Sequence, residues 1–160
     1  MAEDLILPKT QDKTEIYEAI LPQIKGLITY ETDLTANLAN VAAVLKEAFD
    51  FFWVGFYLTK ENQLVLGPFQ GPVACTRIPF TKGVCGAAYT QRKTLVVDDV
   101  ESFPGHIACS SLSKSEVVVP IFKGEEVVAV LDVDSKELSD FNEVDEKFLT
   151  EIGRLVGEKF

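Results

Sequence analysis

Three cysteines are the residues of this chain best suited to chemistry. They lie at positions 75, 85 and 109, with the spacing C-x9-C-x23-C. An odd count in a chain of 160 residues does not fit the disulfide framework of a small secreted domain. In a reducing compartment three interpretations remain, namely packing in the core, metal binding and thiol chemistry.

Cys109 is the hardest of the three to explain as a core residue. It follows the only histidine, His106, in the stretch PGHIACSSLSKSE, whose Ser, Gly, Pro and Lys residues predict an exposed loop. The spacing H-x2-C is half of a zinc site, but the chain has no C-x2-C pair, which disfavours structural zinc. Nearby backbone N–H groups with Ser110, Ser111 and Ser113 could instead cradle an oxyanion.

The other two cysteines lie near glycines. Cys85, in GVCGAA, is close to the start of a short helix predicted over Gly83 to Arg92, where the helix dipole would favour a thiolate. A small buried residue would suit this position equally well. Cys75 lies in GPVACTR, beside a glycine-rich bend.

Thiols that converge on one pocket could work as a nucleophile and a resolving group. One thiolate attacks an electrophilic atom and becomes a sulfenic acid. A second thiol condenses with it to a disulfide, and an external reductant restores the pair. This chemistry needs no metal and no organic cofactor.

A group of acids is predicted near one end of the sheet. In VVAVLDVDS, strand alternation places Val128, Val130, Asp132 and Asp134 on one face, with the two carboxylates about 7 Å apart. Glu116 opens the run SEVVVPIF, which hairpin pairing would bring alongside. The acids are either solvated at a strand end, or they bind a cation, an ammonium group or a metal, or share a proton at raised pKa.

The run FFWVGFYL adds aromatic side chains to this picture. Alternation predicts one face made of Phe52, Val54, Phe56 and Leu58, and another made of Phe51, Trp53, Gly55 and Tyr57. Both faces could be core, since aromatic residues are common in strands. The alternative makes Trp53 and Tyr57 the walls of a ligand pocket.

Helical and strand patterns alternate along the chain in a way that predicts an α+β fold. Apolar spacing indicates two helices within about 12–49 and one over about 142–159. Within 12–49, the first helix is expected to be kinked or split at Pro22, and the second to be capped by Thr32 or Asp33. Short β-rich runs lie between them, with hairpins at the tips TKEN and KGE. We therefore expect a largely antiparallel sheet covered by helices on at least one face.

The overall composition limits the classes of partner that the protein is expected to bind. A net charge of −10 argues against nucleic acid and anionic membrane surfaces, which attract basic patches. No apolar run reaches the roughly 20 residues that span a bilayer. The acidic start, MAEDLILPKT, lacks the basic region of a signal peptide. We expect a cytoplasmic protein with one domain; whether it forms a homodimer is open.

Four segments together resemble a known family. They are WVGFYL, LGPFQGPVACTRIPFTKGVCGAAYT, TLVVDDVESFPGHIACSSLSKSEVVVPIF and VVAVLDVDS. They are similar to free methionine-(R)-sulfoxide reductases, which are stand-alone GAF domains, over about residues 53–141. The resemblance implies a six-stranded antiparallel sheet flanked by helices, with the terminal helices packed together. The single GAF domain would cover residues 1–160, with helices at about 12–49, sheet and pocket at about 51–135, and the last helix at about 142–159.

The resemblance also implies an activity, the reduction of free methionine (R)-sulfoxide with thioredoxin as electron donor. Cys109 aligns with the cysteine most often assigned as the attacking thiol, and Cys75 and Cys85 align with the candidates for resolving it. In an alternative assignment, Cys85 attacks and Cys109 resolves. The matching pocket residues are the acids Glu116, Asp132 and Asp134 and the aromatics Trp53 and Tyr57.

This activity fits the residue chemistry. Reducing a sulfoxide needs a thiolate at sulfur and a proton at oxygen, so one of the three acids would donate that proton. Another would bind the α-ammonium, which peptide-bound methionine lacks. We expect a lowered pKa at the attacking cysteine and a lid formed by Gly67 to Thr76. The main rival function is a GAF domain that senses a small ligand or a redox change without turnover.

Overall fold

The structure, a computed structural model, describes residues 4–107 and 109–160. The first three residues of the predicted domain, and Ala108 of the PGHIAC segment, lie outside the described residues.

Helices and strands follow one another in the predicted order, with a short strand (Arg77–Pro79) and a short 3-10 helix (Val100–Ser102) in addition. In the described part of the chain the elements are α1 (Lys13–Thr29), α2 (Leu34–Phe49), β1 (Trp53–Lys60), β2 (Gln63–Gln70), β3 (Arg77–Pro79), α3 (Gly83–Gln91), β4 (Leu95–Val97), η1 (Val100–Ser102), β5 (Ser115–Lys123), β6 (Glu126–Ser135) and α4 (Glu143–Gly157). The strands form one sheet in the order β3-β2-β1-β6-β5-β4 with antiparallel neighbours. The predicted six-stranded α+β architecture is confirmed.

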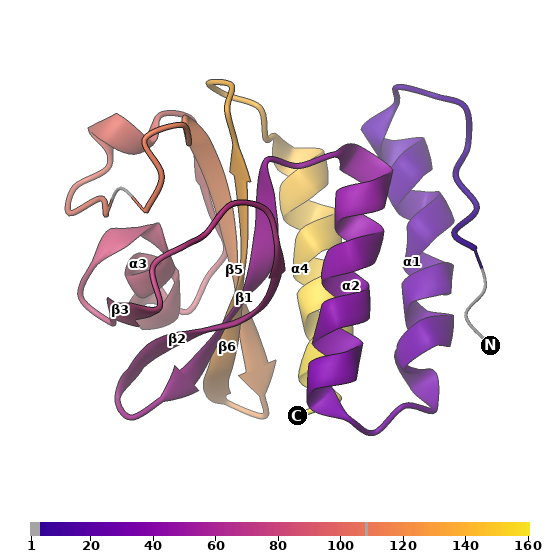
Figure 1. The fold of residues 1–160 in the computed structure, drawn as a ribbon, viewed down its shortest axis with the longest axis horizontal. Helices are drawn as coiled ribbons and strands as arrows, with labels where there is room; N and C mark the ends of the chain where they lie inside the picture. The colour runs from indigo at the N-terminus through magenta and orange to yellow at the C-terminus, as the bar shows by residue number, and fades with distance from the viewer. Residues whose placement is uncertain (1–3, 108) are drawn as a thin grey trace.

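The sheet separates two layers of different character. Helices α2 and α4 cover one face and α1 lies outside them, while α3 and several loops lie on the opposite face (Figure 1). The predicted packing of the terminal helices on one another is confirmed by the contacts of α1 with α4. Buried side chains such as Ile20, Leu45, Phe56 and Leu131 fill the helix side with a continuous apolar core.

One polar network lies inside that helix core. The fully buried Asp145 of α4 accepts hydrogen bonds from the Tyr17 hydroxyl (2.7 Å), the Lys13 Nζ (2.6 Å) and the Asn142 backbone N–H (2.9 Å). Burial first, and then the Asp145 charge, raises the pKa of Tyr17 far above its usual value. The network joins α1 to α4 and completes the N-terminal cap of α4.

Two details of the first helices were open in the sequence. Asp33 is the N-cap of α2 and accepts from the Ala36 N–H at 2.8 Å. Of the two effects expected of Pro22, a kink or a split, the split is wrong, because α1 runs without a break from Lys13 to Thr29. Pro22 is exposed, and the buried residues Ile20 and Ile24 on either side hold the helix against its neighbours.

Strand alternation holds within β1 and fails just before it. Val54 belongs to the helix-side core and Trp53 to a second cluster on the other face. The expected faces of Phe51 and Phe52 are wrong, since Phe51 packs on the helix side and Phe52 on the other. Phe52 lies in a bend before the strand begins, where the two-residue period does not apply.

A similar correction concerns Val128. It was expected beside Val130, but it packs against the helix-side core. The pairing of β5 with β6 shifts between Ile121 and Phe122, so that Ile121 lies opposite Ala129 while Phe122 lies opposite Val127. Val128 is the extra residue of this bulge, which reverses its direction.

None of the helices in the described part of the chain combines the length and the apolar character needed to cross a membrane.

Candidate active site

A pocket lies on the side of the sheet opposite α2 and α4. Its walls come from β1, β5 and β6, from the start of α3, and from the loops before β3 and β5. Seven of the eight predicted site residues line it, namely Trp53, Tyr57, Cys85, Cys109, Glu116, Asp132 and Asp134. The eighth, Cys75, is bonded to Cys109. The structure thus brings together the whole predicted set.

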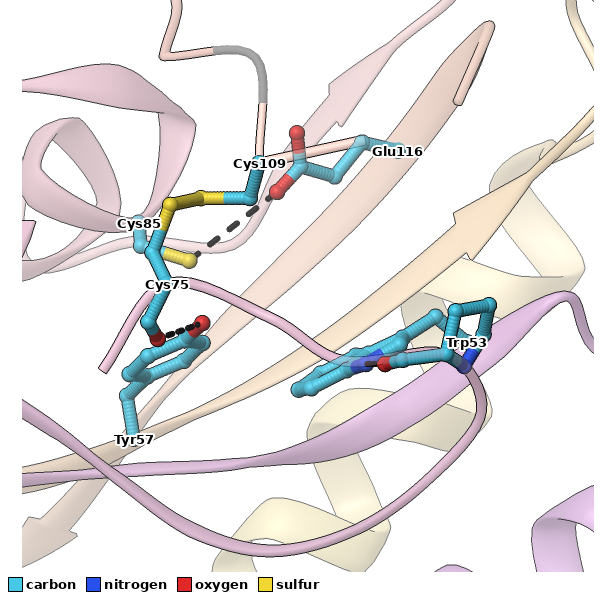
Figure 2. The surroundings of a disulfide bond; sticks show 7 residues. Trp53, Tyr57, Cys75, Cys85, Cys109 and Glu116 are labelled. Carbon is cyan, nitrogen blue, oxygen red and sulfur yellow. Dashed lines mark hydrogen bonds between the residues drawn. A yellow bond between two sulfur atoms is a disulfide. The ribbon is translucent and has the colours of Figure 1, made fainter. Parts of the chain in front are cut away.

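Two of the three cysteines form a disulfide at this pocket. Cys75 and Cys109 are 34 residues apart in sequence, and their Cα atoms are 5.4 Å apart. The bridge joins the loop before β3 to the loop before β5, and Figure 2 shows it close to the Cys85 thiol and the Glu116 carboxyl. Of the two pairings left open for Cys109, the structure contains the one with Cys75.

Cys85 is the free thiol of the described residues, and it is buried. Its Sγ donates to Glu116 Oε1 at 3.9 Å, as the dashed line in Figure 2 marks. Burial, followed by the charges of Asp132, Glu116 and Asp134, raises the pKa of Cys85 well above its usual value. Of the two interpretations left open for Cys85, the structure therefore supports the small buried residue, because burial and three acids disfavour the thiolate.

The three acids lie together as the hairpin pairing predicted. Glu116 of β5 is directly opposite Asp134 of β6, and Asp132 pairs with Val118 on one side and Gly55 on the other. Glu116 and Asp132 are buried, whereas Asp134 is half-buried. No salt bridge of the described residues includes any of the three.

Burial determines the protonation of these acids. It raises the pKa values of Glu116 and Asp134 well above their usual range, and the Asp132 charge raises both further. Burial also raises the pKa of Asp132, but hydrogen bonds from Glu116 and Cys85 oppose this increase. Among the described side chains, Asp132 Oδ1 is buried without a hydrogen-bond partner. Burial therefore favours the protonated forms in this cluster, and one oxygen of Asp132 remains available to a further donor.

The aromatic residues of β1 hold a loop over the pocket. The Trp53 Nε1–H donates to the Pro72 carbonyl (3.1 Å) and the Tyr57 hydroxyl to the Cys75 carbonyl (2.8 Å), both drawn in Figure 2. Of the predicted lid, residues 67–70 belong to β2, so residues 71–76 are the part that reaches the pocket. The pKa of Tyr57 is raised strongly, mainly by burial.

Gly55 allows this arrangement of rings. The Trp53 and Tyr57 centroids are 5.9 Å apart, with an angle of 23° between the planes. A Cβ on Gly55 would lie 2.3 Å from Phe69 Cβ and 2.9 Å from the Trp53 ring. Because real side chains do not approach so closely, a residue other than glycine would displace the pocket wall.

The loop before β5 contributes further polar residues. His106, Ser110 and Ser113 line the pocket, whereas Ser111 is exposed. Burial lowers the pKa of His106, although the Glu101 charge opposes this. The zinc set that combines His106 with the three cysteines does not fit this structure, since two of the thiols are bonded to each other.

Sequence reasoning missed several lining residues. They are Phe52, Ile78, Val84 and Ile107, whereas Pro72, Val73 and Ala74 belong to the predicted lid. Each of these four missed residues lies within three positions of a predicted site residue, so proximity to the cysteines and Trp53 was the signal that could have found them.

The comparisons with known proteins agree with this geometry. A GAF domain model matches residues 31–158. The chain is 62% identical over 157 residues to GAF domain-containing protein A of Dictyostelium discoideum, covering 98% of this chain and 99% of that protein. It is 42% identical over 142 residues to a free methionine-R-sulfoxide reductase of Escherichia coli, covering 88% of this chain and 86% of that protein.

Solved structures show the same similarity in three dimensions. The free methionine-R-sulfoxide reductase of Neisseria meningitidis, solved in complex with its substrate, superposes with a TM-score of 0.94. The two chains are 52% identical, and the superposition covers 98% of this chain and 96% of that one.

Proposed function

Because this chain belongs to the free methionine-R-sulfoxide reductases, GAF-domain oxidoreductases that act on a sulfur group, we propose that it reduces free methionine (R)-sulfoxide with its own thiols. The family resemblance seen in the sequence is thereby confirmed. The observation that carries the proposed mechanism is the Cys75–Cys109 disulfide, which lies at a pocket lined by three acids.

Two cysteines supply the electrons. In the reduced enzyme Cys109, which lines the pocket, attacks the sulfoxide sulfur and takes up its oxygen as a sulfenic acid, so that methionine is released. The Cys75 thiol then attacks the Cys109 sulfur, water leaves, and the disulfide forms. The disulfide in the structure corresponds to the enzyme after this step.

Glu116 is the proposed acid for the sulfoxide oxygen. Its carboxyl is buried, and its pKa is raised well above the usual range, first by burial and then by Asp132 and Asp134, which favours the protonated form that a proton donor requires. A protonated oxygen leaves sulfur more readily than a bare one. Cys85 donates to one Glu116 oxygen and holds the carboxyl in place.

Asp132 is the proposed partner of the substrate's α-ammonium. The neighbouring Glu116 and Cys85 side chains oppose the burial-driven rise in its pKa and so favour its carboxylate form, and its Oδ1 has no partner among the described residues. Peptide-bound methionine lacks an α-ammonium, so this contact favours the free amino acid. Asp134, directly opposite Glu116, completes the acidic wall.

Trp53 and the loop over it are proposed to hold the thioether end of the substrate. The indole offers an apolar surface for the methyl group and a favourable contact for sulfur. Residues 71–76 are tied to Trp53 and Tyr57 and act as a lid that keeps water from the reaction.

Recycling needs an outside reductant, and we propose thioredoxin. Val73, two residues from Cys75, is 89% exposed, so this side of the disulfide is open to a protein dithiol. Such recycling requires a reducing compartment, which favours the cytoplasm. We also propose that residues 1–160 form one domain, since α1 packs on both α2 and α4.

A single-turnover experiment tests the proposal. The reduced protein is mixed with the R or the S form of free methionine sulfoxide, without reductant, and methionine and remaining thiols are counted. We expect about one methionine per protein from the R form alone, with two thiols lost. No methionine from either form, with all three thiols retained, would contradict the proposal.

Single Cys→Ser variants separate the thiol roles. Cys109→Ser forms no methionine. Cys75→Ser forms about one methionine and leaves a sulfenic acid that dimedone traps. Cys85→Ser is the matched control, because Cys85 lies outside the disulfide, and it still yields methionine and the Cys75–Cys109 bridge. Loss of the first turnover in Cys85→Ser alone would assign the attack to Cys85 instead.

A further inference from the structure

A buried cluster of potential metal ligands lies beside the redox cysteines. One atom each of Cys85, Glu116 and Asp132 lies within 4.8 Å of the other two, and all three residues are buried. Figure 2 shows the Cys85 thiol and the Glu116 carboxyl of this cluster facing one another. Because Cys85 is outside the disulfide, the cluster remains when Cys75 and Cys109 are oxidised.

One ligand of this cluster lacks a partner. Asp132 is 6% exposed, and its Oδ1 accepts no hydrogen bond among the described residues. A buried carboxylate oxygen in this state is costly unless a donor or a cation reaches it. No described salt bridge brings a lysine or arginine to Glu116 or Asp132. The cluster is therefore open to a cation from solution.

The donor atoms select the kind of cation. Magnesium and calcium prefer sites made of oxygen alone, whereas a thiolate with two carboxylates suits zinc. Zinc bonds of about 2.3 Å to sulfur and about 2.0 Å to oxygen place tetrahedral ligands roughly 3.5 Å apart. The Cys85 Sγ and Glu116 Oε1 are already 3.9 Å apart, and the Asp132 ligand atom lies within 4.8 Å of both, so the three side chains must move closer together when a metal binds.

We propose that Cys85, Glu116 and Asp132 bind one zinc ion, with the fourth position facing the pocket and occupied by water. Binding converts the Cys85 thiol to a thiolate and releases its proton to solvent. A zinc ion there occupies both Glu116 and Asp132, so it excludes methionine sulfoxide and inhibits the enzyme. The inhibition rests on the proposed function, but the metal binding does not.

Cadmium provides a direct test in the oxidised protein, where Cys85 is the free thiol. Cadmium chloride is titrated into protein carrying the Cys75–Cys109 disulfide, and the ultraviolet cadmium–thiolate charge-transfer band is followed. We expect saturation at about one cadmium per chain and loss of the band when zinc is added. Cys85→Ser abolishes the band, and Asp132→Asn weakens the affinity about tenfold or more.

Asp134→Asn is the matched pocket variant. It removes an acid of the same wall that is not part of the cluster, so its effect on cadmium affinity is smaller than that of Asp132→Asn. Circular dichroism verifies that each variant is folded. If a variant does not fold, the titration of the wild-type protein still tests whether the metal binds. Absence of the band at tenfold excess cadmium, or equal affinity in wild type and Asp132→Asn, would overturn the site. Because no turnover is measured, this result is independent of the methionine assay.

Discussion

The two faces of the sheet each bury an aspartate, and the two carboxylates have different surroundings. Asp145, on the helix side, is 0% exposed and accepts three hydrogen bonds, one of them from a lysine. Asp132, on the pocket side, is 6% exposed, and its Oδ1 accepts none from the described residues. The two aspartates are almost equally buried, so they differ in their hydrogen-bond partners.

This contrast separates a structural acid from a functional one. A fully satisfied buried network stabilises one packing arrangement and leaves nothing for a ligand. An incomplete one costs stability until a ligand completes it, which is what a binding site requires. The same residue type thus acts on stability at Asp145 and, in our proposal, on substrate binding at Asp132.

The largest expected effect is on the helix side. Asp145→Ala leaves the buried Tyr17 hydroxyl without its acceptor and Lys13 without its carboxylate, so the free energy of unfolding falls by about 3–5 kcal/mol. Urea unfolding followed by circular dichroism measures this. Asp132→Ala is the matched substitution, and we expect it to cost less than about 1 kcal/mol because it removes an unsatisfied group. Equal losses in the two variants would refute the contrast.

The next effect is on catalysis. Asp132→Asn keeps the shape of the side chain but removes the charge that pairs with the ammonium, so kcat/KM falls about 100-fold, mainly through KM. Steady-state assays with free methionine (R)-sulfoxide measure this change. Stability should stay equal to wild type or rise. An unchanged kcat/KM would remove Asp132 from the proposed site.

The pocket acids also predict how stability depends on pH. Burial raises the pKa values of Glu116, Asp132 and Asp134, so above about pH 4 the folded chain binds more protons than the unfolded chain. Their stabilising contribution is complete below about pH 4 and is lost as pH rises through the raised values, by up to about 1.4 kcal/mol per pH unit for each extra proton.

Asp132→Asn provides the control for this dependence. It removes one of the three acids and the charge that raises the pKa values of the other two. Urea unfolding at several values between about pH 5 and pH 8 should therefore show a smaller decrease in the variant than in wild type. An equal or steeper decrease would show that these acids titrate normally.

The smallest expected effect concerns the loop over the pocket. Tyr57→Phe removes the hydrogen bond to the Cys75 carbonyl and lowers the free energy of unfolding by about 1 kcal/mol. Tyr89→Phe is the matched control, because Tyr89 stacks on Phe80 and its hydroxyl has no hydrogen bond within the described chain. Its effect should stay within about 0.5 kcal/mol. Similar losses in both variants would mean that the hydroxyl does not hold the loop.

Local patterns predicted most of the fold. The helices followed from apolar spacing, and the hairpin turns fixed the register that places Glu116 beside Asp134. Strand β3 was not predicted from its own residues, since three residues give no readable alternation and the strand forms by pairing with β2. The Tyr17–Asp145 contact spans 128 residues, and no local signal encodes it.

The sequence predicted which residues gather at the site better than it predicted their disulfide pairing and protonation. Residue types and family motifs named eight residues that the structure brings to one pocket, but the partner of Cys109 was left open because sequence spacing alone does not fix a disulfide. The choice between a thiolate and a buried thiol at Cys85 was also left open, because the helix start was visible in the sequence while the burial of Cys85 beside three acids was not. Protonation depends on that three-dimensional environment.

The disulfide between Cys75 and Cys109 has a consequence for the unfolded chain. A bridge over a sequence separation of 34 residues removes chain entropy worth about 3.8 kcal/mol from the unfolded ensemble. In the proposed mechanism, each turnover alternately ties and releases a loop that contains β3, α3 and β4. The oxidised enzyme should melt at a higher temperature than the reduced enzyme, so the melting curve of a sample reports which fraction of the molecules awaits a reductant.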